Sequence, residues 1–191
     1  WALDIYLRRR GQSQELATVW QTGRAAAEQA ADPVALGLAL RKLAHTYAQS
    51  GRHEDARELV ELAMTVVRQT GDRHALAMVH RTYGQASSLA GRHREALTHA
   101  RVSLRVLQAL DDPFSVASQL SSVGWNSTLL GLYEPARAHL NAALTLARKV
   151  GRLDTEANAL DSLGYLAYRT GDHALAVRYY RQGADLHHRT G

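Results

Sequence analysis

The sequence predicts an all-α protein built as a solenoid of antiparallel helix pairs. Three observations support this fold class. Glycine recurs at one constant interval along the chain, the apolar residues between the glycines follow helical rather than alternating spacing, and Ala and Leu abound while aromatic residues make up 6% of the chain. The 191 residues, of which 46% are apolar and 21% charged, suffice for a packed core.

Two glycine series, each with a period of forty positions or a multiple of it, divide the chain into equal units. One series marks the middle of each unit and the other its boundary, where Ala31 and Asp111 fill two of the slots. The units align without a gap, and we therefore expect a single domain over residues 1–191. They comprise a partial unit at 1–30 and full units at 31–70, 71–110, 111–150 and 151–190. The glycines are Gly11, Gly51, Gly91, Gly131 and Gly171 in the first series and Gly71, Gly151 and Gly191 in the second.

Each unit is expected to hold two helices, which in the first full unit cover residues 33–49 and 53–69. Asp32 followed by Pro33 favours a helix start. The carboxylate can cap backbone N–H groups of the first turn, and proline is tolerated at the first helical position because an N–H group there would have no partner within the helix. Gly51 suits the left-handed conformation that follows a helix end. The same signals recur at Asp112-Pro113 and at Gly71.

Small residues occupy three repeated slots at which two helices have to approach closely. A side chain larger than alanine there would force the helices apart, at a cost of about 1–3 kcal/mol per site. The first slot holds Ala44, Gly84, Gly124 and Gly164, the second Ala56, Ala96, Ala136 and Ala176, and the third Ala63, Ser103, Ala143 and Gly183. Two further slots, which alternate with them, hold mostly large residues: Leu43, Tyr83, Val123 and Leu163 in one, and Val60, Leu140 and Tyr180 in the other, where Ala100 takes the fourth place.

This pattern of glycines and small residues resembles the tetratricopeptide repeat (TPR) family over essentially the whole chain. The segments LAHTYAQSGRHEDARELVELA and LGYLAYRTGDHALAVRYYRQG carry the resemblance most clearly. The usual TPR period is about 34 residues. The longer period of forty found here is similar to that of the C-terminal repeats of SARP-type and STAND bacterial transcriptional regulators. The resemblance implies a right-handed superhelical solenoid that binds proteins or peptides and has no enzymatic activity.

The resemblance also implies that the first helix of each unit lines a concave groove for a protein or peptide ligand. Trp125 and Tyr165 have a second interpretation, in which they only pack against each other from adjacent units. The partner-binding residues expected in the groove are Arg41, His45, Arg81, Gln85, Trp125, Asp161, Tyr165, Tyr168 and Arg169. Further groove positions include Leu38, Ala48, Met78, Ser121 and Thr128.

One known TPR ligand does not fit these residues. The carboxylate clamp of chaperone-binding TPR proteins requires Lys and Asn at groove slots that here hold Arg41 and His45. The tail of a chaperone is therefore not an expected partner.

Motifs for catalysis, cofactors and metals are missing from the sequence. It has no phosphate-binding glycine loop, no HExxH, no GxSxG and no cysteine. His53, His93 and His173 share one repeat slot, and because they lie on different units of the solenoid they are too far apart to hold one ion. We expect no catalytic residue, no cofactor and no metal site.

Charge and hydropathy limit the partners further. The net charge of +5 is concentrated in residues 71–110, whose six arginines against two acids give +4, but these arginines spread over both helices and the turn. We expect DNA binding only through domains outside this segment. With no apolar run long enough to span a bilayer and no signal peptide, we expect a cytoplasmic protein without a membrane partner.

The sequence predicts a module of a larger polypeptide, because it starts at Trp1 without an initiator methionine. The expected function is that of the sensor or regulatory domain of a bacterial transcriptional regulator, in contact with the other domains of the same polypeptide. A peptide-pheromone receptor and a general assembly scaffold are the alternatives. Because a solenoid leaves its terminal helices uncovered, a homodimer through an exposed end is also expected.

Overall fold

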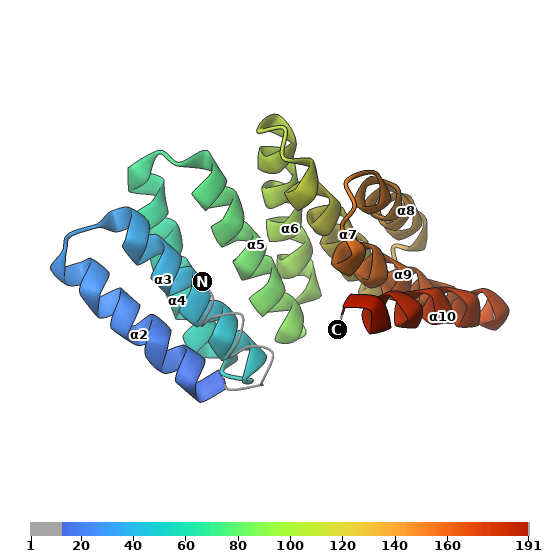
Figure 1. Ribbon diagram of the computed structural model, residues 1–191, viewed down its shortest axis with the longest axis horizontal. Helices are drawn as coiled ribbons and strands as arrows, with labels where there is room; N and C mark the ends of the chain where they lie inside the picture. Colours follow the sequence, from blue (N-terminus) through green and yellow to red (C-terminus); the bar gives the residue numbers. More distant parts are fainter. Residues whose placement is uncertain (1–12, 191) are drawn as a thin grey trace. The chain divides into compact units, whose positions relative to one another are not determined.

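The computed structural model describes residues 13–190, which form nine α-helices and no strand (Figure 1). The predicted all-α class is confirmed, and the predicted helices at 33–49 and 53–69 are found within one residue. Gly11 and Gly191 lie outside the described residues. The helices are α2 (Ser13–Gln29), α3 (Pro33–Gln49), α4 (His53–Thr70), α5 (Arg73–Leu89), α6 (His93–Ala109), α7 (Pro113–Leu129), α8 (Tyr133–Lys149), α9 (Leu153–Arg169) and α10 (His173–Thr190).

The predicted start signals act as helix caps. The Asp32 carboxylate accepts hydrogen bonds from the backbone N–H groups of Val34 and Ala35 at 2.9 and 3.0 Å. The Asp112 carboxylate accepts one from the N–H of Ser115 at 3.1 Å. Each aspartate thereby satisfies donors that the first turn of a helix leaves without a partner.

The turns between helices use left-handed backbone conformations, as predicted. Gly51 and Gly71 have φ angles of 80° and 69°. Ala31 and Asp111 stand in the boundary slots without glycine and still adopt φ angles of 49° and 51°. A side chain with a Cβ is strained in this region, by about 1–2 kcal/mol. The repeat geometry therefore dictates the backbone even where the sequence does not supply glycine.

The chain divides into two compact units, residues 1–99 and residues 100–191. In the first unit α2 packs on α3, α3 packs against α4, and both α3 and α4 contact α5. In the second unit α7 packs against α8, α9 packs against α10, and α9 also contacts α7 and α8. Each unit is therefore a stack of antiparallel helix pairs, with the first helices of successive repeats side by side. The single domain over residues 1–191 stays a prediction.

The small-residue slots lie in the cores of these stacks, and all of their members are buried. A Cβ built on Gly124 would lie 2.5 Å from Cγ of Leu140, and one on Gly164 would lie 2.9 Å from the ring of Tyr180. The alternating large residues fill the remaining space, with Leu140 and Leu163 almost fully buried. Tyr180 differs from this expectation, since 41% of it is exposed on α10.

In residues 13–190, none of the helices combines the length and the hydropathy that a bilayer crossing requires.

Candidate functional site

The predicted partner-binding residues lie on the first helices of the repeats and form one set in each unit. Arg41 and His45 lie on α3, and Arg81 and Gln85 lie on α5. These four belong to the first unit. The second unit carries the remaining five on two helices, with Trp125 on α7 and Asp161, Tyr165, Tyr168 and Arg169 on α9.

The four residues of the first unit extend two helical rows that lie side by side. On α3 the row runs Val34, Leu38, Arg41, His45, and on α5 it runs His74, Met78, Arg81, Gln85. The steps of four, three and four residues keep each row on one face of its helix. Since α3 and α5 pack together, the two rows form one surface, which we call the α3–α5 face. His45, Arg81 and Gln85 are all partly exposed on it.

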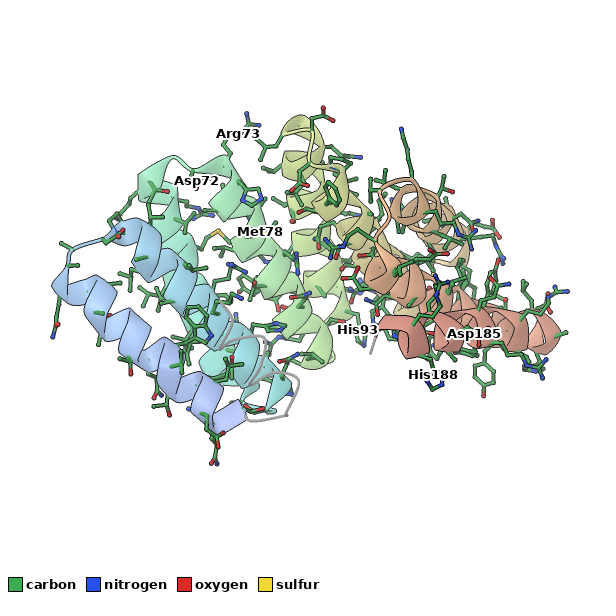
Figure 2. The ribbon with its side chains drawn as sticks, viewed as in Figure 1. Asp72, Arg73, Met78, His93, Asp185 and His188 are labelled. Atoms are coloured by element: carbon green, nitrogen blue, oxygen red, sulfur yellow. The ribbon has the colours of Figure 1, made fainter. Side chains whose placement is uncertain are left out.

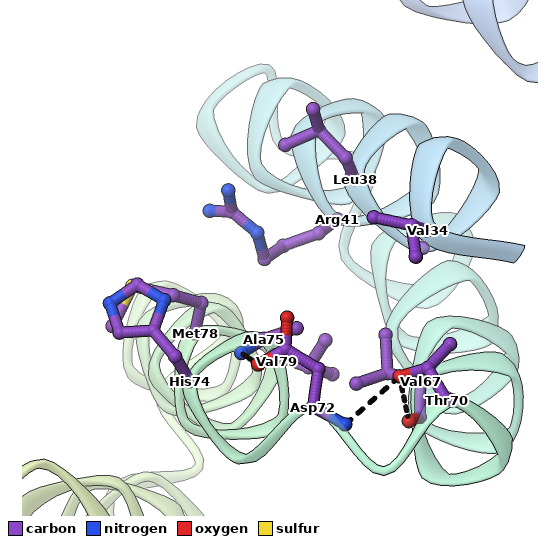
Figure 3. A pocket seen from close by; sticks show the side chains of 11 residues that line it. Val34, Leu38, Arg41, Val67, Thr70, Asp72, His74, Ala75, Met78 and Val79 are labelled. Carbon is purple, nitrogen blue, oxygen red and sulfur yellow. Dashed lines mark hydrogen bonds between the residues drawn. The ribbon is translucent and has the colours of Figure 1, made fainter. Parts of the chain in front are cut away.

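A cavity of about 190 Å³ opens at the N-terminal end of the α3–α5 face, where α4 meets α5 (Figure 3). Its apolar wall contains Val34 and Leu38 of α3, Val67 of α4, and Ala75, Met78 and Val79 of α5. Its polar rim contains Arg41, Thr70, Asp72 and His74. In Figure 2, Met78 lies along α5 beyond Asp72 and Arg73, which mark the turn at which the helix begins.

Only part of this cavity was predicted. Leu38, Arg41 and Met78 were expected along the groove, and all three line the cavity. Val34 and His74 continue the same rows by one turn, so the helical spacing could have identified them. Val67 and Thr70 come from α4, a second helix, and the groove pattern carries no signal for them.

The acidic group on the cavity rim serves as a helix cap. The Asp72 carboxylate accepts a hydrogen bond from the N–H of Ala75 at 2.9 Å. Thr70 links α4 to the same turn, because its hydroxyl donates to the carbonyl of Val67 at 2.8 Å and accepts from the N–H of Asp72 at 3.2 Å. The rim is thereby held in place by local hydrogen bonds at the start of α5.

The second unit contains a continuous group of rings, the aromatic cluster, formed by Trp125, Tyr165, Tyr168 and His173. Trp125 and Tyr165 have ring centroids 5.1 Å apart, Tyr165 and Tyr168 6.4 Å, and Tyr168 and His173 5.5 Å. Tyr168 is the most open of the three predicted members, with 56% of it exposed. The structure thus brings together three of the predicted residues and adds His173 from α10.

Arg169 joins the aromatic cluster to α8. Its guanidinium donates hydrogen bonds to the hydroxyls of Tyr165 at 3.2 Å and Tyr133 at 3.3 Å. It also lies 5.8 Å from the centroid of the Tyr165 ring. These contacts fix a positive charge at the edge of the cluster, with further N–H donors on the same guanidinium.

Asp161 connects α9 to α10. Its carboxylate contacts Nε2 of His187 on α10 at 2.9 Å. Helix α10 approaches closely here because the third small slot holds Gly183, where an added Cβ would collide with this carboxylate. Asp161 was predicted as a partner-binding residue, and the structure shows it in a helix–helix contact.

Three further positions predicted for the groove are buried. Ala48 is 2% exposed, Ser121 8% and Thr128 0%. Ala48 belongs to the hydrophobic core of the first unit, and the hydroxyl of Thr128 donates to the carbonyl of Gly124 at 3.0 Å. Placing these residues on the groove surface was therefore wrong, because the helices rotate these positions into the packed interface.

Sequence reasoning missed a polar network in the first unit. The Nδ1 atoms of His80 and His99 lie 2.9 Å apart, and the Tyr83 ring stacks on His99 at 3.9 Å. Tyr83 in turn donates its hydroxyl proton to Glu61 at 3.0 Å, and Arg57 contacts the same carboxylate. Burial, together with the charges of His99 and Arg68, lowers the pKa of His80 to about 4. Burial also lowers the pKa of His99, against the opposing effect of Glu95.

Among residues 13–190, no group of three or more His, Asp or Glu side chains is arranged to hold a metal ion. His53 and His93 start α4 and α6 and are half-buried, and each has an Nδ1 atom buried without a hydrogen-bond partner.

The comparisons with known proteins agree with the helix-pair architecture. The family model described as "Tetratricopeptide repeat" matches residues 35–109 and 127–187. No curated protein matches the chain. Among solved structures, BtubC from P. vanneervenii has a TM-score of 0.78 at 18% identity, with 98% of this chain and 78% of that chain covered.

Two other similar structures come from larger proteins. A Rap protein complexed with Competence and Sporulation Factor has a TM-score of 0.84 at 17% identity, with 96% of this chain and 51% of that chain covered. A STAND protein with a tetratricopeptide repeat sensor from Pyrococcus horikoshii has a TM-score of 0.79 at 20% identity, with 97% of this chain and 28% of that chain covered. At these identities the similarity concerns the fold. The chain belongs to the tetratricopeptide repeat family and is a protein-interaction module.

Proposed function

We propose that this chain is the sensor or regulatory module of a bacterial transcriptional regulator, and that it binds a protein or peptide partner on its first helices. Fold similarity to a STAND protein with a tetratricopeptide repeat sensor supports this role. In this proposal the chain itself performs no catalysis, and the other domains of the polypeptide bind DNA.

The aromatic cluster is the observation that carries the proposal. Tyr and Trp supply a large contact area at a low cost in side-chain entropy, and binding hot spots are enriched in Trp, Tyr and Arg. Trp125 and Tyr165 remain partly exposed, Tyr168 is mostly exposed, and Arg169 adds hydrogen-bond donors at their edge. These groups suit the recognition of an extended peptide or a protein segment.

A peptide-pheromone receptor is the second candidate. It is favoured by the fold similarity to a Rap protein that was crystallised with Competence and Sporulation Factor. An assembly scaffold is the third. A receptor binds one short peptide at the aromatic cluster, whereas a scaffold binds folded partners and gives no selected short sequence.

The experiment is a selection from a library of random peptides of roughly a dozen residues, followed by calorimetric titration of the selected peptides. Trp125→Ala and Tyr168→Ala are the test variants, and Phe114→Ala is the matched control. Phe114 is an aromatic residue of α7 that is 49% exposed and lies outside the aromatic cluster. We expect the test variants to weaken binding about thirtyfold, as hot-spot truncations of about 2 kcal/mol do, and the control to bind normally.

The same variants separate binding from packing. The centroid distance of 5.1 Å between Trp125 and Tyr165 is also what the packing interpretation expects. If Trp125→Ala lowers the melting temperature strongly while leaving peptide affinity intact, the role of this residue is structural and the proposal loses its main support.

A further inference from the structure

The exposed face of α6 carries a row of polar side chains, which we call the α6 row. Its members are four, three, four and three residues apart, and this spacing keeps them on one side of the helix. They all belong to one helix, which runs from His93 to Ala109 (Figure 1). The α6 row contains no acid and consists of Arg94, Thr98, Arg101, Arg105 and Gln108.

The three arginines of the α6 row have charges that the fold does not use. Within residues 13–190, their guanidinium groups make no hydrogen bond and no ion pair. The two acids of the repeat at 71–110 are engaged elsewhere. The Asp72 carboxylate caps α5, and Glu95 forms an ion pair with Arg92 at 3.0 Å. The positive charge of the α6 row is therefore open to a ligand.

The other repeats show that packing does not require arginine in this row. Residues forty positions apart occupy the same place in successive helix pairs, and the corresponding positions of α4, α8 and α10 are exposed as well. Each of those rows contains at least one acid, so the fold does not explain the charge of the α6 row. The corresponding residues are Glu54, Glu58, Glu61, Thr65 and Arg68 on α4, Glu134, Ala138, Asn141, Thr145 and Arg148 on α8, and Ala174, Arg178, Arg181, Asp185 and His188 on α10.

Every member of the α6 row is a hydrogen-bond donor of a type that binds phosphate. Arginine binds phosphate oxygens with two parallel N–H groups, and threonine and glutamine side chains also donate to them. The row has no aromatic side chain on which an unpaired base could stack. It also has no large apolar side chain that could enter a membrane or anchor a folded partner. These features favour the backbone of a nucleic-acid duplex over single strands, membranes and acidic proteins.

The length of the α6 row matches a short stretch of duplex. Arg94 and Arg105 are separated by about 16.5 Å along the helix axis, at about 1.5 Å per residue. One DNA strand carries one phosphate per about 3.4 Å of its axis, so this distance covers roughly five phosphates. Arg101 lies between the two, about 6 Å from Arg105 along the axis. Each of the three arginines can therefore contact a different phosphate.

We propose that the α6 row binds the phosphate backbone of double-stranded DNA, independently of base sequence. The inference goes beyond the proposed function, since it concerns a second helix and not the first helices that bind the protein or peptide partner. In the sequence, the six arginines of residues 71–110 spread over two helices and a turn, and DNA binding is therefore expected only through other domains. The structure gathers three of these arginines in one exposed row. Base sequence is read by the other domains, and the α6 row adds affinity for the backbone.

The test is an anisotropy titration of fluorescein-labelled DNA duplexes of about 20 base pairs with the full chain, at salt concentrations from about 30 to 200 mM. We expect two duplexes of unrelated sequence to bind within about twofold of each other, because phosphate contacts carry no sequence information. The logarithm of the binding constant should fall with the logarithm of the salt concentration, with a slope of about 0.9 for each contacted phosphate.

Two double variants locate the contact. Arg101→Gln with Arg105→Gln removes two charges from the α6 row. Arg178→Gln with Arg181→Gln removes the same charge from the corresponding row of α10, which contains Asp185 (Figure 2). We expect the first double variant to bind DNA about tenfold more weakly at low salt and to reduce the salt slope by about 1.8, and the second to change the affinity less than about twofold. Urea unfolding should show unchanged stability for both, because exposed arginine and glutamine have similar helix propensities.

Equal losses of DNA affinity in the two double variants overturn the inference, because binding then follows the net charge alone. The inference also fails if no duplex binds at low salt, or if the first double variant leaves the salt slope unchanged. Labelled polyglutamate is the competing ligand. If it binds as tightly as the duplex and loses affinity in the first double variant, the α6 row binds acidic proteins and the inference is overturned. The selection of peptides that bind through Trp125 tests the proposed function separately.

Discussion

Gly124 offers a direct test of the close helix packing in the second unit. Replacing glycine by alanine inside a helix normally stabilises it by about 0.5–1 kcal/mol. At Gly124 the new methyl group would lie 2.5 Å from Cγ of Leu140 and 3.2 Å from the carbonyl oxygen of Ala136. Leu140 is fully buried and cannot move aside, so overpacking of about 1–3 kcal/mol outweighs the gain. We expect Gly124→Ala to lower the free energy of unfolding by about 1 kcal/mol.

Gly23 provides the matched control for the same substitution. It lies in α2, and an added Cβ would be 3.8 Å from Trp20 and 4.0 Å from Ala39, which are ordinary contact distances. Gly23→Ala should therefore raise the free energy of unfolding by about 0.5–1 kcal/mol. The assay is urea unfolding of the full chain, followed by circular dichroism.

A double-mutant cycle of Gly124→Ala with Leu140→Ala tests whether the contact with Leu140 causes the loss of stability. Removing the colliding side chain should restore the helix-forming benefit of Gly124→Ala, which gives a coupling energy of about 1–3 kcal/mol. The absence of coupling, or stabilisation by Gly124→Ala alone, would refute the close approach of α7 and α8 at this slot.

Three further outcomes are expected. Ala31 has a left-handed backbone with φ of 49°, so Ala31→Gly should relieve strain and raise the free energy of unfolding by about 1 kcal/mol. Gly71→Ala introduces the same strain and should lower the free energy of unfolding. Urea unfolding of each variant measures whether stability rises or falls. Because the folded-state pKa of His80 is lowered to about 4 from an unfolded value of about 6.5, stability should be constant above pH 6.5 and fall as the pH drops from there toward 4. After allowance for solvent screening this loss is about 1–2 kcal/mol, and a His80→Gln variant should lose less. Val177 and Tyr180 are 47% and 41% exposed on α10, so we expect the chain to self-associate through this helix. Light scattering should detect the association, and Val177→Lys should weaken it. A monomer at high protein concentration would contradict this prediction.

The helices and their turns were predictable because their signals are local and repeated. Asp32 with Pro33 identifies a helix start, and Gly51 identifies a turn, without reference to any distant residue. The constant repeat period then transfers each signal to the next unit. The same repetition placed the small slots correctly, since Gly124 and Gly164 both lie against large side chains of the following helix.

The candidate site was predictable only in part, because helical spacing indicates a face and not its neighbours. Leu38, Arg41 and Met78 were expected along one groove and line the cavity, but the cavity also contains Val67 from α4. Thr128 has groove spacing and is nevertheless fully buried.

The sequence by itself determined the fold class, the helix boundaries and the residues at which helices approach each other, because periodic spacing and turn chemistry act within a few residues. The tertiary structure decided which side chains meet. It pairs Asp161 with His187, places His80 against His99, and joins Trp125 to Tyr165. These contacts depend on the rotation and separation of neighbouring helices, which arise from the packing of many side chains at once and carry no local signal.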